Sequence, residues 1–351
     1  MTTLPLHTPY DGTSKPFTIG LKPIDFDRWI EIDAHYPAYI EEKRRLYAEI
    51  PDKVFVAEAG TQAAQQEVAD LIAGHLHQHA PTTLCPSSAQ SQRAQPTPTP
   101  PRSAQHLSPS KGERKGATPD ISSPPSNGGE VVCEANRSGG RTPAGSLSGQ
   151  PLYHASLQVQ EDLILMRRGD EGWRLAAGSL CFPSSWSLQE KFRQPLEQIH
   201  VPVPGFGPGS RPDQLIARMF DALSPDQLME RYNWSIQAGD ALYLPLSNDA
   251  RDERAATRPS KFPGRDMAAS AFIRIERQTL RKLPLSRDVL FTIRIHLDPL
   301  KVIAEHPERA RLAASFAEQL TALDAAQLDY KGMTADRDRL VDLLLSMARG
   351  G

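Results

Sequence analysis

Cysteine is scarce in this chain of 351 residues. The three cysteines, Cys85, Cys133 and Cys181, follow no spacing typical of a zinc or an iron–sulfur site. An odd number of cysteines without a disulfide framework favours a reducing compartment. We therefore expect a cytoplasmic protein without a metal–thiolate centre of its own.

Several other signals are missing. Lys and Arg number 40 against 42 for Asp and Glu, so there is no basic excess of the kind that nucleic-acid-binding proteins show. No apolar run approaches the roughly 18 residues that a membrane helix needs, and the N-terminus does not have the profile of a signal peptide. No glycine-rich dinucleotide fingerprint occurs in a strand–turn–helix setting. These absences predict a soluble protein that binds neither nucleic acid nor membranes.

Proline is abundant, with 31 residues, and is unevenly distributed. Residues 81–150 are rich in Pro, Ser and Gly, lack large apolar side chains and show no helical or strand period. Such a segment cannot offset the entropy cost of ordering. We expect a disordered low-complexity insert, either a spacer or an interaction segment.

The rest of the chain shows helical and strand patterns, which predict an α+β fold. Strands are expected in two hairpins, one with its turn at 169–172 and one with its turn at 284–287. Polar and apolar residues alternate in the second hairpin, which predicts one buried face and places His296 on the polar face. Helices are expected at 26–50 with a break at Pro37, at 61–79 with Thr61 as N-cap, and at 211–223, 308–323 and 335–347.

These patterns divide the chain into four parts. They are an N-terminal helical part at 1–80, the disordered insert at 81–150, a β-rich core at 151–300 and C-terminal helices at 301–351. The insert falls at a surface junction between the helical part and the first hairpin, where an insertion can be tolerated.

One histidine stands out by its context. His200 is followed by Val201-Pro202-Val203-Pro204, and the two prolines should hold the chain extended and end any helix at the histidine. A ring whose direction is set by a stiff backbone suits a metal or haem ligand. The alternative is an ordinary structural histidine.

Several motifs in one order resemble the family that contains the haem-dependent oxidative N-demethylases. They cover the chain outside the insert and the extreme C-terminus. They are QEDL (160–163), CFPSSW (181–186), Lys191, IHVPVP (199–204), RYNW (231–234), RIERQTL (274–280), Leu283-Pro284, FTIR (291–294) and a lead-in at 20–79 that includes Ala63, Ala64 and Glu67.

The resemblance implies a PAS-like antiparallel sheet with flanking helices that binds b-type haem. Its activity would be the oxidative removal of a methyl group from a small amine such as dimethylamine, with oxygen, releasing formaldehyde. Electrons would come from NADPH through a reductase with flavin and an iron–sulfur centre. Because this chain has no dinucleotide fingerprint and no cysteine cluster, that reductase would be a separate polypeptide.

The resemblance also suggests roles for individual residues. His200 would be the axial ligand of the haem iron, and Lys191 and Arg277 would bind the haem propionates, with Arg274 and Arg281 as further candidates. Glu276 would be the catalytic carboxylate that receives a protonated amine. The aromatic residues that fit beside such a cation in kind are Trp186, Tyr232 and Trp234.

Other residues compete for the role of metal ligand. Cys181 could supply a thiolate, although its apolar surroundings favour a buried structural thiol. His154 lies at the edge of the insert. His75, His77 and His79 could hold zinc on one end of a helix, or form an ordinary solvated helix end.

Two other functions stay open. The first is a haem- or ligand-binding PAS-like sensor or scaffold without turnover. No helical linker to an output module is apparent, which favours the enzyme. The second is an inactive relative, which the insert suggests; however, the insert interrupts none of the motifs.

Overall fold

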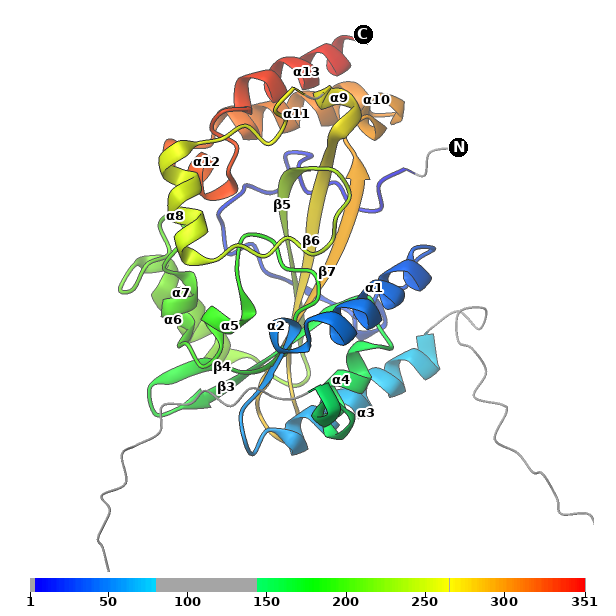
Figure 1. The fold of residues 1–351 in the computed structure, drawn as a ribbon, viewed down its shortest axis with the longest axis vertical. Coiled ribbons are helices and arrows are strands. Elements are labelled where there is room, and N and C mark those ends of the chain that lie inside the picture. Colours follow the sequence, from blue (N-terminus) through cyan, green and yellow to red (C-terminus); the bar gives the residue numbers. More distant parts are fainter. Residues whose placement is uncertain (1–3, 80–143, 265, 351) are drawn as a thin grey trace, which may run out of the picture. The chain divides into compact units, whose positions relative to one another are not determined.

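The computed structural model describes residues 4–79, 144–264 and 266–350, all within one compact unit. Its centre is a seven-stranded sheet in the order β1-β5-β6-β7-β3-β4-β2, antiparallel at every pairing (Figure 1). The strands are β1 (Lys22–Ile24), β2 (Phe55–Ala57), β3 (Asp162–Gly169), β4 (Gly172–Ser179), β5 (Leu228–Ala238), β6 (Ala271–Lys282) and β7 (Val289–Pro299).

Helices surround this sheet, so the predicted α+β class, with an antiparallel sheet and flanking helices, is confirmed. They are α1 (Tyr36–Glu49), α2 (Pro51–Val54), α3 (Gln62–His79), α4 (Pro151–Ser156), α5 (Leu188–Lys191), α6 (Leu196–His200), α7 (Arg211–Ala222), α8 (Asn248–Thr257), α9 (Met267–Ser270), α10 (Val302–Glu305), α11 (Arg309–Thr321), α12 (Ala325–Lys331) and α13 (Arg337–Arg349). Two 3-10 helices, η1 (Phe26–Arg28) and η2 (Ala144–Gly149), are also present.

Both predicted hairpins form. Gly169 pairs with Gly172 at the tip of β3–β4, where Gly172 has a φ of +100° that favours glycine. The β6–β7 hairpin closes through a hydrogen bond from the Leu283 N–H to the Asp288 carbonyl, 2.8 Å long. The buried Glu67 of α3 accepts hydrogen bonds from the Leu285 and Ser286 N–H groups. A helix distant in sequence therefore holds this turn in place.

The helix predictions agree with the structure where the apolar period is clear. Helix α3 begins directly after Thr61, and α7, α11 and α13 lie where helices were expected. Pro37 occupies the first turn of α1, where its missing N–H costs nothing. The prediction of helix from residue 26 is wrong for 29–35, since only the short η1 precedes α1.

Strand β5 was not predicted. Its two faces are both partly polar: Arg231, Asn233 and Ser235 lie on one face, and Glu230 and Tyr232 on the other. The alternation of apolar and polar residues that identifies a half-buried strand is therefore blurred. The polarity of β5 reflects what it packs against on each side, which is visible only in the folded protein.

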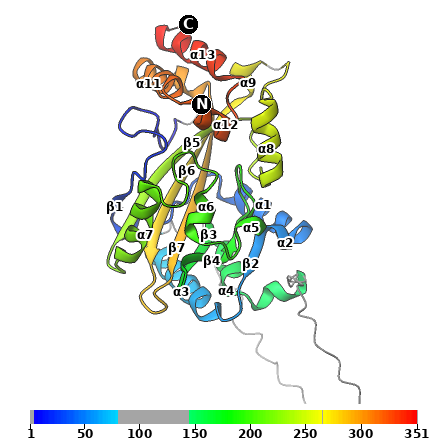
Figure 2. The same ribbon diagram turned by 90° about the vertical axis from the view of Figure 1, so that its left-hand side faces the viewer.

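Both faces of the sheet are covered. Helices α5 to α8 lie over one face, where Phe17, Ile19 and Leu21 of the N-terminal segment also line the space beneath them. The rest of that segment, with η1, α1 and α3, lies over the other face (Figures 1 and 2). The expectation of one solvated polar face in the second hairpin is wrong: Arg274, Arg277 and Arg294 are at most 1% exposed and His296 is 8% exposed. Partners from other elements bind most of their polar groups, although the Nε atoms of Arg274 and Arg294 have no partner among the described residues.

Disorder is predicted for residues 81–150. Of these, residues 81–143 lie outside the described part of the chain. From 144 on the chain is described, and η2 (Ala144–Gly149) buries Leu147 in the core. The expected boundary at 150 therefore lies too late in the sequence. None of the helices in the described ranges combines the length and apolar character that a membrane span requires.

Candidate functional site

A cavity of about 550 Å³ lies between helices α5 to α8 and one face of the sheet. Its volume is typical of cofactor and ligand sites. Apolar side chains from both layers form most of its wall. They include Ile164, Met166, Leu175, Phe182, Trp186, Phe206, Ile216, Phe220, Leu280, Phe291 and Ile293.

His200 is the histidine of this cavity wall and the last residue of α6. Its Nδ1 lies 2.9 Å from the Leu196 carbonyl oxygen, one helical turn earlier, so Nδ1 carries the proton and donates to that oxygen. This bond fixes the tautomer and leaves Nε2 with its lone pair free to bind a metal. Burial lowers the pKa of His200, which favours the neutral ring.

The backbone after His200 differs from the expected extended form. Val201 has φ −45° and ψ −43°, which is helical although Pro202 follows it. The Val203 N–H donates to the His200 carbonyl over 2.8 Å, and the Phe206 N–H donates to the Val203 carbonyl. The helix does end at His200, as predicted. Consecutive turns, rather than an extended segment, hold the histidine in place.

The charged side chains of the cavity wall are mostly cationic. Glu276 is the one carboxylate among the described lining residues. Among the side chains that the structure describes, none of the cations forms an ion pair with a carboxylate within 4.0 Å. These cations are Lys191, Arg231, Arg251, Arg254, Lys261 and Lys331.

Burial and mutual repulsion act on these cations. Burial, with repulsion from Arg254 and Lys331, lowers the pKa of Lys261 to about 7. Burial also lowers the pKa of Lys331 to about 8, with Arg231 adding to the effect and Glu276 opposing it. The Nε atoms of Arg231, Arg251 and Arg254 are buried without a hydrogen-bond partner. An uncompensated group of buried cations is costly, and it suits a site that receives an anionic ligand.

Glu276 lies on the cavity side of β6. Asn233 and Gln278 donate hydrogen bonds to its Oε2, over 3.3 and 3.0 Å. Arg231, Lys331 and Tyr330 are close enough for its charge to influence their pKa values. The carboxylate therefore lies at the edge of the cationic group, and two amide side chains fix its orientation.

The structure brings together three of the four residues that the sequence suggested for the site. Lys191 lines the same cavity as His200 and Glu276, and its Nζ donates to the Ile199 carbonyl, 3.0 Å away. Arg277 does not join them. It follows Glu276 in β6, and because neighbouring residues of a strand point to opposite faces, its guanidinium lies on the far side of the sheet.

On that far side, Arg277 is fully engaged. Its Nε lies 2.6 Å from Glu230 and 3.2 Å from Glu31, and its Nη1 donates to the Trp29 carbonyl over 2.9 Å. It also donates to the Arg28 carbonyl. A guanidinium with these partners holds the N-terminal segment to the sheet and is not available to the cavity.

The other cation candidates also have structural partners. Arg274 donates to the Phe182 and Leu242 carbonyls and to Gln237. Arg281 stacks over the rings of Phe26 and Trp29. Among the aromatic candidates, Trp186 lines the cavity. Tyr232 and Trp234 instead face the other side of the sheet, where Trp234 packs edge-on against Phe316.

The competing ligands do not line the cavity. Cys181 is completely buried, and burial raises the pKa of its thiol, so the structural interpretation of this cysteine agrees with its surroundings. His154 is exposed and bonds to the Ser148 carbonyl. His75 is buried beside Trp29, and burial with repulsion from His79 lowers its pKa to about 4.

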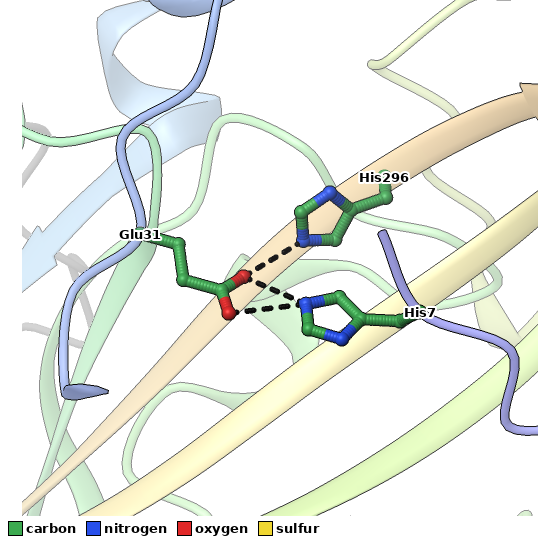
Figure 3. Close-up of side chains that lie close together, drawn as sticks. All are labelled: His7, Glu31 and His296. Atoms are coloured by element: carbon green, nitrogen blue, oxygen red, sulfur yellow. Dashed lines mark hydrogen bonds and ion pairs between the residues drawn. The ribbon is translucent and has the colours of Figure 1, made fainter. Parts of the chain in front are cut away.

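A second cluster of polar side chains lies on the far face. His7, Glu31 and His296 bring their ligand atoms within 4.8 Å of one another (Figure 3). The sequence placed His296 on a polar strand face but gave no indication of its partners. His7 and Glu31 lie in irregular segments without periodicity, so no local pattern could have identified them.

The sequence also missed most of the cavity's cations. Arg231 belongs to the RYNW motif and could have been selected from it. Arg251 and Arg254 of α8 and Lys331 of α12 come from helices with no marked motif. They meet because their elements, separated in sequence, pack over the same end of the sheet.

One comparison with known proteins bears on this site. A family model described as haem-dependent oxidative N-demethylase, alpha subunit-like, matches residues 20–97 and 127–341. The match includes every residue named above as lining the cavity. The match extends over most of the chain and includes the motifs at 160–163, 181–186, 199–204 and 274–280.

Proposed function

This chain belongs to the haem-dependent oxidative N-demethylase, alpha subunit-like, family, and on that premise we propose that its cavity binds haem with His200 as the axial ligand. Three features of one cavity support the proposal. They are a histidine with a free Nε2, an apolar wall and a group of cations without carboxylate partners. A haem presents complementary features, namely an iron, an apolar ring and two propionates.

The cations fit the propionates better than the pair that the sequence suggested. Arg231, Arg251 and Arg254 have buried Nε atoms without partners, and a carboxylate would supply them. Lys191 stays in the proposed set because it lines the same cavity. Arg277 is replaced, since its guanidinium already binds Glu230 and Glu31.

The proposed haem-binding core is PAS-like and runs from β3 to β7. These five strands are adjacent in the sheet, in the order β5-β6-β7-β3-β4. Helices α5, α6 and α7 follow β4 in sequence and precede β5, and they cover the face that lines the cavity. In this arrangement the ligand comes from a covering helix while the sheet supplies the opposite wall.

The reaction that we propose is the oxidation of an N-methyl carbon of a small methylated amine, such as dimethylamine. One N-methyl group, one O₂, two electrons and two protons give the demethylated amine, formaldehyde and one water. The bound haem would supply oxygen activation. The chain's own residues would hold the ring, exclude water with the apolar wall and position the amine. Glu276, oriented by Asn233 and Gln278, would accept the hydrogen bond of the protonated amine.

The two electrons require a second protein, in our proposal. The family description names an alpha subunit-like chain, which supports assembly with partner subunits. Cys181, the free cysteine of the described residues, is buried in the core. We propose a reductase that carries flavin and an iron–sulfur centre and takes electrons from NADPH.

The proposal is tested by reconstituting the purified chain with haem. We expect a Soret band that saturates as haem is added, and no turnover with NADPH alone. With a chemical reductant or the cognate reductase, oxygen and dimethylamine, formaldehyde should appear. Haem binding without formaldehyde from any methylated amine would favour the sensor alternative, and failure to bind haem would reject the site.

Glu276 requires a test that separates amine binding from charge balance. If it binds the amine, Glu276→Gln should raise the KM for the amine about tenfold or more while haem affinity changes little. If it only neutralises Arg231 and Lys331, the variant should alter haem affinity or stability and leave KM unchanged. Gln278→Glu is not a suitable control because it adds charge. Ser235→Ala removes a nearby polar lining group without changing charge and serves as the matched control.

A further inference from the structure

The face of the sheet opposite the cavity carries a cluster that the proposed haem chemistry does not use. We propose that His7, Glu31 and His296 form a binding site for a divalent transition-metal ion of the zinc class (Figure 3). His7 comes from the N-terminal segment, Glu31 from the segment between η1 and α1, and His296 from β7. His7 also lies before the residues that match the family model.

The donor set and its spacing suit such an ion. Two imidazoles and one carboxylate are ligands of Zn²⁺ and of other divalent first-row metals. Ligand atoms bound at about 2.0–2.2 Å to one ion lie about 2.8–3.1 Å apart in octahedral geometry and about 3.3–3.6 Å apart in tetrahedral geometry. The Nε2 atoms of His7 and His296 lie 3.0 and 3.1 Å from the same Glu31 oxygen, Oε2.

The groups behind the three ligands orient them toward one another. His7 Nδ1 lies 3.2 Å from the Tyr232 hydroxyl, and His296 Nδ1 lies 3.9 Å from Asp33 Oδ2. In both rings Nδ1 therefore faces an outer partner, while Nε2 faces Glu31. An outer hydrogen bond such as that between Tyr232 and His7 fixes the tautomer and the ring direction of a histidine that binds a metal, whereas Asp33 acts on His296 through its charge alone.

Both oxygens of Glu31 face the cluster. His7 Nε2 lies 3.0 Å from each of them, whereas His296 contacts Oε2 and Arg277 approaches Oε1 at 3.2 Å. Asp298 lies two residues after His296 on the same face of β7, and its buried Oδ2 has no hydrogen-bond partner among the described residues. It lies close enough to interact electrostatically with His7. A cation would compensate this carboxylate, and water or Asp298 could complete the coordination.

The consequence is a cross-link between the N-terminal segment and the sheet. The segment is otherwise held near this point by a hydrogen bond to Tyr232 and ring contacts of His7 with Tyr232 and His296, at 4.9 Å between centroids in each case. An ion bound by ligands from three separate segments would add its binding free energy to folding. We therefore assign the site a structural role, separate from the cavity.

The experiment is metal binding by the full chain, measured together with haem binding. After treatment with a chelator and dialysis against Zn²⁺, we expect about one ion per chain by mass spectrometry of the metal. Co²⁺ should give visible absorption bands of a nitrogen- and oxygen-coordinated site. His7→Gln and His296→Gln should each weaken binding roughly a hundredfold or more. Exposed His154, changed to Gln, is the matched control and should leave metal content unchanged.

Each other outcome rejects the site. A wild-type chain that retains no Zn²⁺ or Co²⁺ would show that the cluster is a hydrogen-bonded network only. Metal binding that survives His7→Gln would place the ion elsewhere. Circular dichroism of the variants identifies any loss of fold, and His7→Gln is the more informative variant because its residue lies outside the regular elements. The haem spectrum of the same samples should not change, so this proposal and the haem proposal can fail independently.

Discussion

The two faces of the central sheet bury their charges in different ways. On the face covered by the N-terminal segment, Arg277 and Arg294 each contact carboxylates, at 2.6 Å from Glu230 and 2.6 Å from Asp33. On the cavity face, Arg231 and its neighbouring cations have no carboxylate partner within 4.0 Å among the described residues, and only Glu276 carries negative charge in the wall.

This difference indicates what each face is for. Buried charges that are paired and hydrogen-bonded hold chain segments together, because removing one partner leaves the other uncompensated. Most of the cavity cations are hydrogen-bonded to neutral groups, such as the carbonyls that Arg254, Lys261 and Lys331 contact. Buried charges that lack a partner of opposite charge cost free energy in the protein alone, and the cost is recovered when a ligand of opposite charge binds. We infer that the N-terminal side of the sheet is structural and that the cavity side is the ligand site. Four predictions test this comparison.

The largest effect is expected from the ligand histidine of the cavity face. His200→Ala should abolish haem binding or weaken it strongly, because no other histidine of the described residues lines the cavity. His296→Ala, on the opposite face, and His154→Ala, on the surface, should retain the haem spectrum. The measurement is titration with haem followed by absorbance. An unchanged spectrum in the His200 variant would remove the distinction between the faces, with Cys181 the next residue to examine.

A large loss of stability is expected on the face opposite the cavity, which we call the paired face because its arginines Arg277 and Arg294 contact carboxylates. Arg277→Met removes a guanidinium that binds Glu230, Glu31 and two carbonyl oxygens, and leaves buried carboxylate charge uncompensated. The free energy of unfolding should fall by about 3–5 kcal/mol. Urea unfolding measures it. Haem affinity of the folded fraction should not change; a variant of normal stability that bound haem poorly would instead return Arg277 to the haem site.

Replacing the corresponding arginine on the cavity face should not lower the free energy of unfolding and could raise it. Arg231→Met removes a buried cation whose Nε has no partner and whose pKa is lowered by burial. Without haem, stability should be unchanged or higher by about 1 kcal/mol, because an apolar group replaces an uncompensated charge. Haem affinity should fall about tenfold, as a charge-assisted hydrogen bond is lost. Equal losses of stability in the Arg231 and Arg277 variants would contradict the comparison.

The smallest effect is expected on the pH dependence of the free energy of unfolding, through His75 on the paired face. His75 packs edge-on against Trp29, and burial lowers its pKa to about 4. The unfolded chain takes up a proton near pH 6.5 and the folded chain only near pH 4, so stability should decrease as pH falls between these values. The decrease should be about 1–2 kcal/mol after allowance for solvent screening.

The check is the difference between the pH dependence of the wild type and that of His75→Gln, measured by urea unfolding. Because other groups titrate in the same range, only this difference reports on His75. The variant should lack the additional decrease below pH 6.5. Parallel pH curves would show that His75 carries its proton equally well in both states.

Local pattern predicts part of the site. The family resemblance suggests Glu276 and Arg277 for one site, but consecutive residues of a strand point to opposite faces, so the strand pattern of this segment already separates them. The same alternation separates Arg231 from Tyr232. His200 was found from its proline-flanked position, yet the turn that holds it could not be foreseen, because Val201 adopts a helical conformation that the following Pro202 disfavours.

Local sequence patterns are enough to locate the two hairpins, the helices at 62–79, 211–222, 309–321 and 337–349, and the family motifs. Which charges meet depends on the packing of elements that are distant in sequence. Glu31 contacts His296 across 265 positions of sequence, and the cavity's cations come from α5, β5, α8, α12 and the segment between α8 and α9. Periodicity reports whether a residue is buried, whereas the choice of partner depends on how distant elements pack, and that choice separates the structural face of this sheet from its ligand face.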